Sequence, residues 1–327
     1  MQRQFVVLLP VIVLAAGWHF LQKYQIEGLE ALGIKPRGQQ AAQQPAAGSV
    51  LPPARPGDVL RIATFNIQAF GEKKLADANV AACLAELVRK FDVVAIQEIR
   101  AQDANLLNRF VEIVNQAGVP YDCVVGPRLG RTDSKEQYAY LYDTETIEVD
   151  RHAMYTVEDP DDLLHREPLV AGFRARGAPA NEAFTFTLVN IHTDPDETDG
   201  EIDALADVFQ AVRNDGRGED DVIILGDLNV DDQHLGRLGQ IRNLIAAIYG
   251  MPSNTHGTQL YDNLLFDSRS TVEFTGRAGV DDLMKLYKLS QEEALEVSDH
   301  FPVWGEFSVF EGGDPGRLAT RDERDVR

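Results

Sequence analysis

The chain has 327 residues, of which 44% are hydrophobic and 25% are charged, and it carries a formal net charge of −21. These proportions are ordinary for a soluble globular protein, and the length suffices for one large domain or two small ones. The negative charge argues against a broad electrostatic surface for a polyanion, because phosphate contacts need Lys and Arg, but it leaves room for a local positive or metal-bearing cleft.

The N-terminal run Phe5–Phe20 is almost purely apolar and follows Arg3. It is long for the core of a signal peptide and short for a membrane span, which needs about 20 residues. No clear A-x-A cleavage site precedes Lys23. Residues 1–24 are therefore predicted to be an uncleaved signal-anchor, with a cleaved signal peptide as the close alternative and a buried soluble helix as the third. The main domain is expected to be exported, either membrane-anchored or secreted, as suits a bacterial envelope.

Two segments of biased composition flank the rest of the chain. Lys35–Gly57 is rich in Pro, Gln, Ala and Gly and lacks apolar periodicity, so residues 25–57 are predicted to be a linker. Residues 311–327 are charged and contain Gly, and they are expected to be a disordered tail. This organisation leaves residues 58–310 as the folded domain.

Between these flanks the hydrophobic pattern alternates between strand and helix periods. Strands are predicted at Val59–Ile67, Asp92–Ile99, Tyr121–Gly126, Gln137–Asp143, Phe184–Thr193, Asp221–Asp227 and His300–Val309, and helices at Leu75–Phe91, Ala104–Gly118 and Glu201–Asn214. Several strands follow one another with no helix between them, which argues against a single parallel sheet. The pattern favours an α/β fold in which two sheets pack face to face with the helices outside.

The stretch Val222–Asp232 ends an apolar run with the sequence Gly-Asp-Leu-Asn. Residues two apart in a strand point to the same side, so Asp227 and Asn229 are expected to project together from the end of this strand. The ends of strands are where α/β proteins usually place their chemistry. The alternative is a plain turn, because Asp and Asn are common turn residues.

Other predicted strands also end in polar residues that an apolar core does not need. Single members have structural alternatives: Asn66 could cap a turn, and a lone histidine is more often structural than catalytic. Taken together, the carboxylates, amides and two histidines suit a hard divalent cation bound through oxygen, with imidazoles for proton transfer. The set comprises Asn66, Glu98, Asn190, His192, Asp227, Asn229, Asp299 and His300.

Six motifs follow one another along the chain: "FNIQAFGEKK", "VVAIQEIR", "REPLV", "VNIHTDP", "LGDLNVD" and "SDHFPV". In this order they resemble the endonuclease/exonuclease/phosphatase superfamily, most closely deoxyribonuclease I, to which "VVGPRLGRTDSKEQYAYLY" and "YDNLLFD" are also similar. The likeness covers Leu60 to Phe307. It implies a deoxyribonuclease I-like four-layer α/β sandwich, in which two packed mixed β-sheets are flanked by helices. It also implies a metal-dependent phosphodiesterase that cuts DNA as an endonuclease.

The resemblance implies a role for the metal ligands and for both histidines. Glu98, with Asn66 and Asp299 nearby, would hold Mg²⁺ or Mn²⁺, which would neutralise charge on a phosphoryl oxygen. His192 and His300 would flank the scissile phosphate. One of the two would help to activate a water, and the other would protonate the leaving oxygen.

Two further acids are implied to orient these histidines. Glu136, in "SKEQY", would orient His192, and Asp262, in "YDN", would orient His300. Each carboxylate would fix its imidazole and stabilise the charged form, as the orienting acid of a hydrolytic triad does.

The remaining implied roles concern the nucleophile and the phosphate. Asp227 and Asn229 would position both of them. Arg166, in "HREP", would contact the phosphate, because a guanidinium suits that geometry. Arg100 and Asn190 complete the predicted substrate-binding set.

The chain departs from the deoxyribonuclease likeness at several positions. Gln68 stands where the likeness carries Arg, and Ser134 stands where it carries a DNA-contacting Tyr. These changes weaken the case for the same mode of duplex binding and leave the phosphodiester chemistry untouched. Cys83 and Cys123 form no C-x-x-C pair, which argues against a zinc–thiolate site, and the disulfide cysteines of the animal enzymes have no counterparts. Cys83 lies in a helical apolar pattern, which indicates core packing.

The sequence also allows a further metal site and two other functions. Glu158–Asp162 ("EDPDD") could bind a structural Ca²⁺, although a solvated acidic loop is the commoner reading. A phosphatase or phosphodiesterase acting on a small or lipid phosphoester is the second functional hypothesis, because the membrane anchor and the negative charge suit it. A catalytically dead binding module is the third, and the full set of acids and histidines argues against it. The expected partners are a DNA substrate and the membrane, and the chain is expected to be a monomer.

Overall fold

The computed structural model describes residues 24–27, 33–36, 57–131 and 135–313. The predicted signal-anchor, most of the predicted linker, the predicted tail beyond Gly313, and Ser134 lie outside the described residues. Within the described ranges, no helix combines the length and apolarity needed to pass through a membrane.

The chain divides into two units, Met1–Gln44 and Pro45–Arg327. In the first unit, β1 (Tyr24–Glu27) pairs in antiparallel fashion with β2 (Gly33–Pro36). The second unit contains two six-stranded sheets and carries all the predicted site residues.

The first large sheet has the strand order β13-β14-β3-β4-β6-β5. Its strands are β3 (Val59–Phe70), β4 (Val93–Ile99), β5 (Tyr121–Val125), β6 (Gln137–Asp143), β13 (Phe274–Val280) and β14 (Val303–Ser308). β3 and β4 are parallel and the other neighbours are antiparallel, so the sheet is mixed.

The second large sheet has the order β11-β12-β10-β9-β8-β7. Its strands are β7 (Ile147–Thr156), β8 (Leu169–Ala175), β9 (Thr185–His192), β10 (Val222–Asp227), β11 (Leu244–Ala246) and β12 (Asp262–Asp267). Here β9 and β10 form the parallel pair. Each sheet therefore contains a parallel pair, and the predicted mixed sheets are confirmed.

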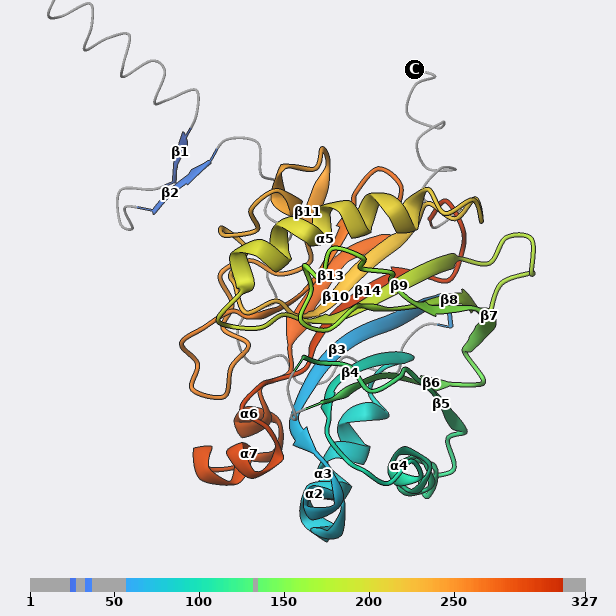
Figure 1. The fold of residues 1–327 in the computed structure, drawn as a ribbon, viewed down its shortest axis with the longest axis vertical. Helices are drawn as coiled ribbons and strands as arrows, with labels where there is room; N and C mark the ends of the chain where they lie inside the picture. Colours follow the sequence, from blue (N-terminus) through green and yellow to red (C-terminus); the bar gives the residue numbers. More distant parts are fainter. Residues whose placement is uncertain (1–23, 28–32, 37–56, 132–134, 314–327) are drawn as a thin grey trace, which may run out of the picture. The chain divides into compact units, whose positions relative to one another are not determined.

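Helices lie on the outer face of each sheet (Figure 1). α2 (Glu72–Ala76), α3 (Ala78–Val88) and α4 (Leu106–Asn115) cover the first sheet, and α5 (Thr198–Arg213) covers the second. Two short helices, α6 (Leu283–Tyr287) and α7 (Gln291–Val297), precede β14. The four layers are helix, sheet, sheet and helix, which confirms the predicted sandwich.

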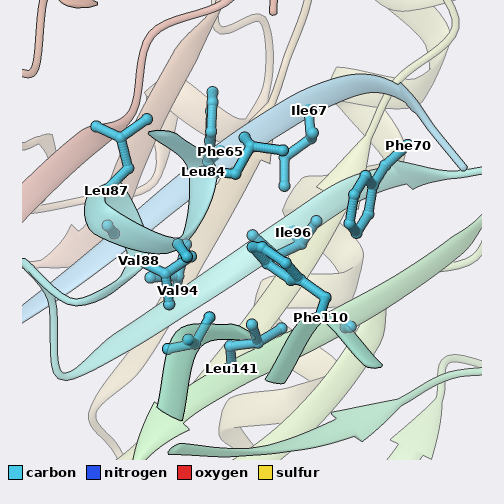
Figure 2. Packing of buried hydrophobic residues seen from close by; sticks show 14 of the residues in the cluster. Phe65, Ile67, Phe70, Leu84, Leu87, Val88, Val94, Ile96, Phe110 and Leu141 are labelled. Carbon is cyan, nitrogen blue, oxygen red and sulfur yellow. The ribbon is translucent and has the colours of Figure 1, made fainter. Parts of the chain in front are cut away.

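The buried residues of β3 alternate between two cores. Leu60 and Ile62 pack between the two sheets, whereas Phe65 and Ile67 pack against the helices. Figure 2 shows side chains from β3, β4, α3 and α4 pointing toward one another in this outer core. A strand that is buried on both faces reads as a continuous apolar run, which explains the unbroken "VVAI" that begins β4 at Val93.

The predicted helix Leu75–Phe91 is two helices in the structure. α2 ends at Ala76 and α3 begins at Ala78, with Asp77 between them. The Asp77 side chain accepts hydrogen bonds from the backbone N–H groups of Asn79 and Val80, so it caps α3. This local competition for the backbone interrupts a pattern that periodicity alone reads as one helix.

Candidate active site

Asp227 lies at the end of β10, beside the ends of two neighbouring strands. The register pairs it with His192 at the end of β9 and with Asp262 at the start of β12. Its Oδ2 atom accepts a 3.0 Å hydrogen bond from Nδ2 of Asn66, which belongs to the other sheet. The same oxygen lies 3.5 Å from Nε2 of His192 and 3.5 Å from Nε2 of His300. The structure thus brings residues from both sheets around one buried carboxylate.

His192 is held by a buried acid on its other nitrogen. Nδ1 of His192 lies 2.7 Å from Oε1 of Glu136, and Nε of Arg166 lies 3.0 Å from the same oxygen. Burial alone would raise the pKa of Glu136, but the hydrogen bond and charge of His192, followed by the charge of Arg166, outweigh burial and lower it. Burial lowers the pKa of His192, and Glu136 and then Asp227 raise it by more. The arrangement stabilises a proton on the imidazole.

His300 has the equivalent arrangement on the other side of Asp227. Its Nδ1 lies 2.8 Å from Oδ2 of Asp262, and the hydroxyl of Ser253 donates a 2.7 Å hydrogen bond to that oxygen. Burial lowers the pKa of His300, but the charges of Asp262 and Asp227 outweigh burial and raise it to about 10. The two carboxylates favour the protonated imidazole, and its Nε2 faces Oδ2 of Asp227 at 3.5 Å.

Glu98 lies at a distorted end of β4. The register shifts between Ile96 and Ile99, and Glu98 has a positive φ of 59°. Such bulges bend a strand and re-aim its side chains, and a non-glycine residue with positive φ is strained. The strain is held by two hydrogen bonds: Asn66 donates 3.2 Å to Oε1 of Glu98, and the backbone N–H of Ala69 donates 2.9 Å to Oε2.

Asp299 lies beside His300, with its Oδ1 atom 3.9 Å from Nε2. This Oδ1 is buried and has no hydrogen-bond partner among the described residues. The carboxylates of Glu98 and Asp299 and the amide oxygen of Asn66 are hard oxygen donors, the class that Mg²⁺ and Ca²⁺ prefer. A buried carboxylate oxygen with no donor is what a cation would satisfy, so Asp299 suits a divalent metal. The amide oxygen of Asn66 accepts a 2.9 Å hydrogen bond from the backbone N–H of Gln68.

Asn229 is placed differently from the expectation. β10 ends at Asp227, so the prediction that alternation along one strand aligns the two side chains is wrong. Asn229 has a φ of 51°, and its backbone N–H donates 3.0 Å to Oδ1 of Asp227, which is the side-chain-to-backbone bond of an Asx turn. The side-chain amide of Asn229 donates 2.9 Å to the carbonyl of Thr193. Asn229 still lies beside the site, and this Asx turn places it there.

The two arginines lie at different depths. Arg100 has a side chain that is 41% exposed and forms a 2.9 Å ion pair with Glu98. Arg166 is buried, and its Nε also donates 3.0 Å to the carbonyl of His192. Arg100 is therefore open to a substrate, whereas Arg166 is engaged with Glu136 and the strand end.

Asn190 does not lie with the other predicted site residues around Asp227. Its side chain is fully buried between the sheets, where its oxygen accepts 2.7 Å from Nε2 of Gln97. Its amide nitrogen donates 3.2 Å to each of the carbonyls of Ile96 and Ala139. The residue joins the two sheets and leaves no group free for a substrate.

Four residues that sequence reasoning did not single out support this site. The hydroxyl of Ser298 donates 2.6 Å to the carbonyl of Asn66 and accepts 3.0 Å from the N–H of His300. Its place in the "SDHFPV" motif was the one available signal. The hydroxyl of Tyr138 accepts a hydrogen bond from the N–H of His192, and the hydroxyl of Ser253 donates one to Asp262. The ammonium group of Lys74 donates to two backbone carbonyls. The contributors are Lys74, Tyr138, Ser253 and Ser298.

Two other predictions concern regions away from the site. In the acidic loop, Asp162 pairs with Arg131 at 3.0 Å and Asp159 accepts 2.7 Å from the N–H of Leu164. Two of the acidic side chains of this loop are therefore engaged with other groups of the chain. Cys83 and Cys123 are free thiols, and Cys83 packs against the outer core.

Comparisons with known proteins found a matching family model, similar deoxyribonucleases and solved structures of similar fold. The family model "Endonuclease/Exonuclease/phosphatase family" matches residues 63–300. Deoxyribonuclease gamma of Rattus norvegicus is 33% identical over 261 residues, which are 75% of this chain and 83% of that protein. Deoxyribonuclease-1 of Gallus gallus is 28% identical over 262 residues, 75% of this chain and 90% of that protein. The solved endonuclease/exonuclease/phosphatase family protein of Bacteroides thetaiotaomicron is similar in fold, with a TM-score of 0.53 and 17% identity over 76% of this chain and 97% of that one.

Proposed function

The chain belongs to the endonuclease/exonuclease/phosphatase family. We propose that it is a metal-dependent phosphodiesterase that cuts DNA as an endonuclease. One observation carries the proposal: Nε2 of His192 and Nε2 of His300 each lie 3.5 Å from Oδ2 of Asp227. The Nδ1 atom of each imidazole also contacts a buried carboxylate, Glu136 for His192 and Asp262 for His300. Two imidazoles on either side of one point are what an in-line displacement at phosphorus needs.

The proposed reaction uses one imidazole as base and the other as acid. A water between the phosphate and the first imidazole gives its proton to Nε2 as its oxygen attacks phosphorus. The second imidazole, protonated with the help of its carboxylate, gives the proton on Nε2 to the leaving oxygen as the phosphorus–oxygen bond breaks. Asp227 lies between the two nitrogens and orients the water, and Asn66 fixes Asp227. General acid–base catalysis of this kind contributes about 10²- to 10⁴-fold to the rate.

Glu98, Asp299 and the side-chain oxygen of Asn66 would hold Mg²⁺ or Mn²⁺. When bound, the ion supplies positive charge that stabilises the phosphoryl oxygens in the transition state. The support for these ligands is the unpartnered, buried Oδ1 of Asp299 and the strained backbone that aims Glu98. The hydrogen bonds from Asn66 and from the N–H of Ala69 keep Glu98 in place before a substrate arrives.

The phosphate contact is assigned to Arg100. Its guanidinium is 41% exposed and lies 2.9 Å from Glu98 and 3.8 Å from Glu136, at the rim of the site. Arg166 is assigned the positioning of Glu136 and His192, because its side chain is buried against both. Asn229 shapes the turn that carries Asp227.

A second candidate is hydrolysis of a small or lipid phosphoester. The net charge of −21 and Gln68 near the end of β3 support it, because both weaken binding to a long polyanion. Nicking of a supercoiled plasmid by the purified full-length chain, with Mg²⁺ and with EDTA, tests the first candidate. Release of phosphate or head group without nicking would favour the second.

We also propose that the folded domain is exported, that residues 1–24 anchor it to the membrane, and that it acts as a monomer. The apolar run Phe5–Phe20 and the absence of a clear cleavage site before Lys23 support the anchor. N-terminal sequencing of the purified chain tests the anchor, because a cleaved signal peptide would give a new N-terminus. Light scattering in detergent tests the monomer.

A further inference from the structure

Three carboxylates converge at the far end of β10 from Asp227. Asp221 directly precedes β10, Glu273 directly precedes β13, and Glu311 follows β14. A carboxylate oxygen from each lies within 4.8 Å of the others. Six residue steps lead along the extended chain from Asp221 to Asp227, about 20 Å at 3.3 Å per residue, so this remote acid cluster is distinct from the candidate active site.

Two members of the remote acid cluster are buried with an unsatisfied oxygen. Asp221 is 1% exposed and Glu273 is 2% exposed. Oδ1 of Asp221 and Oε2 of Glu273 have no hydrogen-bond partner within the part of the chain that the structure describes. Among those same residues, no Lys, Arg or His forms an ion pair with any of the three carboxylates. Buried carboxylates normally have donors or counter-ions, so these oxygens are exceptions that call for a partner.

Backbone groups hold the carboxylates in this arrangement. The N–H of Gly312 donates 2.5 Å to Oε1 of Glu273, and the N–H of Thr185 donates 3.1 Å to Oε2 of Glu311. Each of these acids therefore has one oxygen fixed by the chain and the other available. Burial, followed by the charge of Glu273, raises the pKa of Asp221 to about 8. A hydrogen bond with the Asp221 carboxyl partly offsets the burial that raises the pKa of Glu311.

We propose that Asp221, Glu273 and Glu311 bind a divalent cation, with Ca²⁺ as the ion that fits. Ca²⁺ takes six to eight oxygens at about 2.4 Å in flexible geometry, and oxygens on opposite sides of such an ion lie about 4.8 Å apart. Three separate loops suit this tolerance better than the near-ideal octahedron that Mg²⁺ demands. The ion would join β10 of the second sheet to β13 and β14 of the first, so its role is to stabilise the packing of the two sheets.

The test is the thermal unfolding of the purified full-length chain with and without Ca²⁺. The parent for this test carries Glu98→Gln and Asp299→Asn, so that a cation at the candidate active site does not contribute. At a Ca²⁺ concentration about 100-fold above Kd, the Tm of the parent is expected to rise by about 5 to 10 °C over its value in EDTA. Calorimetric titration is expected to count one Ca²⁺ per chain.

Two variants of this parent separate the remote acid cluster from nonspecific charge effects. Glu273→Gln is expected to abolish the rise in Tm and the bound Ca²⁺, and Glu311→Gln, at an exposed position, is expected to weaken both. Glu112→Gln, which makes the same charge change at an exposed site on α4, is expected to leave both unchanged. Equal Ca²⁺ responses in Glu273→Gln and Glu112→Gln, or no response in the parent, would overturn the proposal.

Discussion

Asn66 of β3 donates a 3.0 Å hydrogen bond from its side-chain amide to Oδ2 of Asp227 on β10. This bond crosses from one sheet to the other at the edge where the parallel strands of both sheets end. The same amide reaches Glu98 at 3.2 Å, so one buried side chain connects the proposed metal ligands with the proposed catalytic carboxylate. The site is therefore a product of how the two sheets pack.

Glu136→Gln is expected to lower the pKa of His192, because the hydrogen bond and charge of Glu136 are the largest influences that raise it. Nitrogen NMR of the histidine side chains during a pH titration measures the change. His300 provides the internal control, because its own orienting acid is Asp262. An unchanged pKa of His192 in the variant would show that Glu136 does not orient this ring.

The His300–Asp262 pair is expected to stabilise the fold in a pH-dependent way. The pKa of His300 is raised from 6.5 to about 10, so the contribution is complete below pH 6.5 and is lost as the pH rises toward 10. His300→Gln should therefore destabilise the protein more at pH 6 than at pH 9.5, with a slope of up to about 1.4 kcal/mol per pH unit. Urea unfolding at several pH values measures the slope.

The control for this experiment is His152→Gln, which removes an exposed histidine of β7. The control measures the effect of the same His-to-Gln change at an exposed position outside the candidate active site. A slope of opposite sign, in which His300→Gln destabilises the protein more at pH 9.5 than at pH 6, would mean that His300 is neutral in the folded protein.

Lys74→Met is expected to cost about 1–3 kcal/mol of unfolding free energy, because two carbonyls lose a charged donor. Nζ of Lys74 donates 2.7 Å to the carbonyl of Ile67 and 2.7 Å to that of Val297, and burial lowers the pKa of Lys74 to about 8. These carbonyls lie next to Asn66 and near Asp299. Denaturant unfolding, with Lys73→Met as the exposed control, checks the prediction, and equal effects in both variants would contradict it.

Asn190→Leu is expected to destabilise the sandwich by about 1–3 kcal/mol and to leave the KM for DNA unchanged, because the side chain is buried and engaged with Gln97. Unfolding and steady-state nicking measured on the same preparation separate the two effects. A raised KM with unchanged stability would restore Asn190 to the substrate-binding role that the sequence resemblance implied.

The sequence predicted the two-sheet architecture and seven of its strands, but it did not reveal β7, β8, β11, β12 or β13. Several predicted site residues lie together because strand ends in an α/β fold meet at one edge. Asp227 and His192 illustrate this: each ends an apolar run, and the parallel register places them side by side. Asn190 could not be separated from His192 by pattern, because its partners come from the other sheet. Asn229 was misplaced because Asp227 ends the strand by bonding the backbone two residues later.

Contacts between distant segments could not be predicted. Tyr138 of β6, for example, accepts the backbone N–H of His192 on β9, 54 residues along the chain. The remote acid cluster joins residues at positions 221, 273 and 311, each of which reads as an ordinary surface acid in its own segment. The break at Asp77 was hidden because a capping aspartate and a helical periodicity occupy the same stretch.

Nicking of supercoiled plasmid measures the proposed hydrolysis of phosphodiester bonds itself. The purified full-length chain is incubated with Mg²⁺, with Mn²⁺ and with EDTA, beside His192→Ala, His300→Ala and the control His152→Ala. We expect nicking that requires a divalent metal, a loss of about 10²- to 10⁴-fold in both active-site variants, and no loss in the control. Intact plasmid in the presence of folded, metal-bound protein, or equal activity in all three variants, would contradict it.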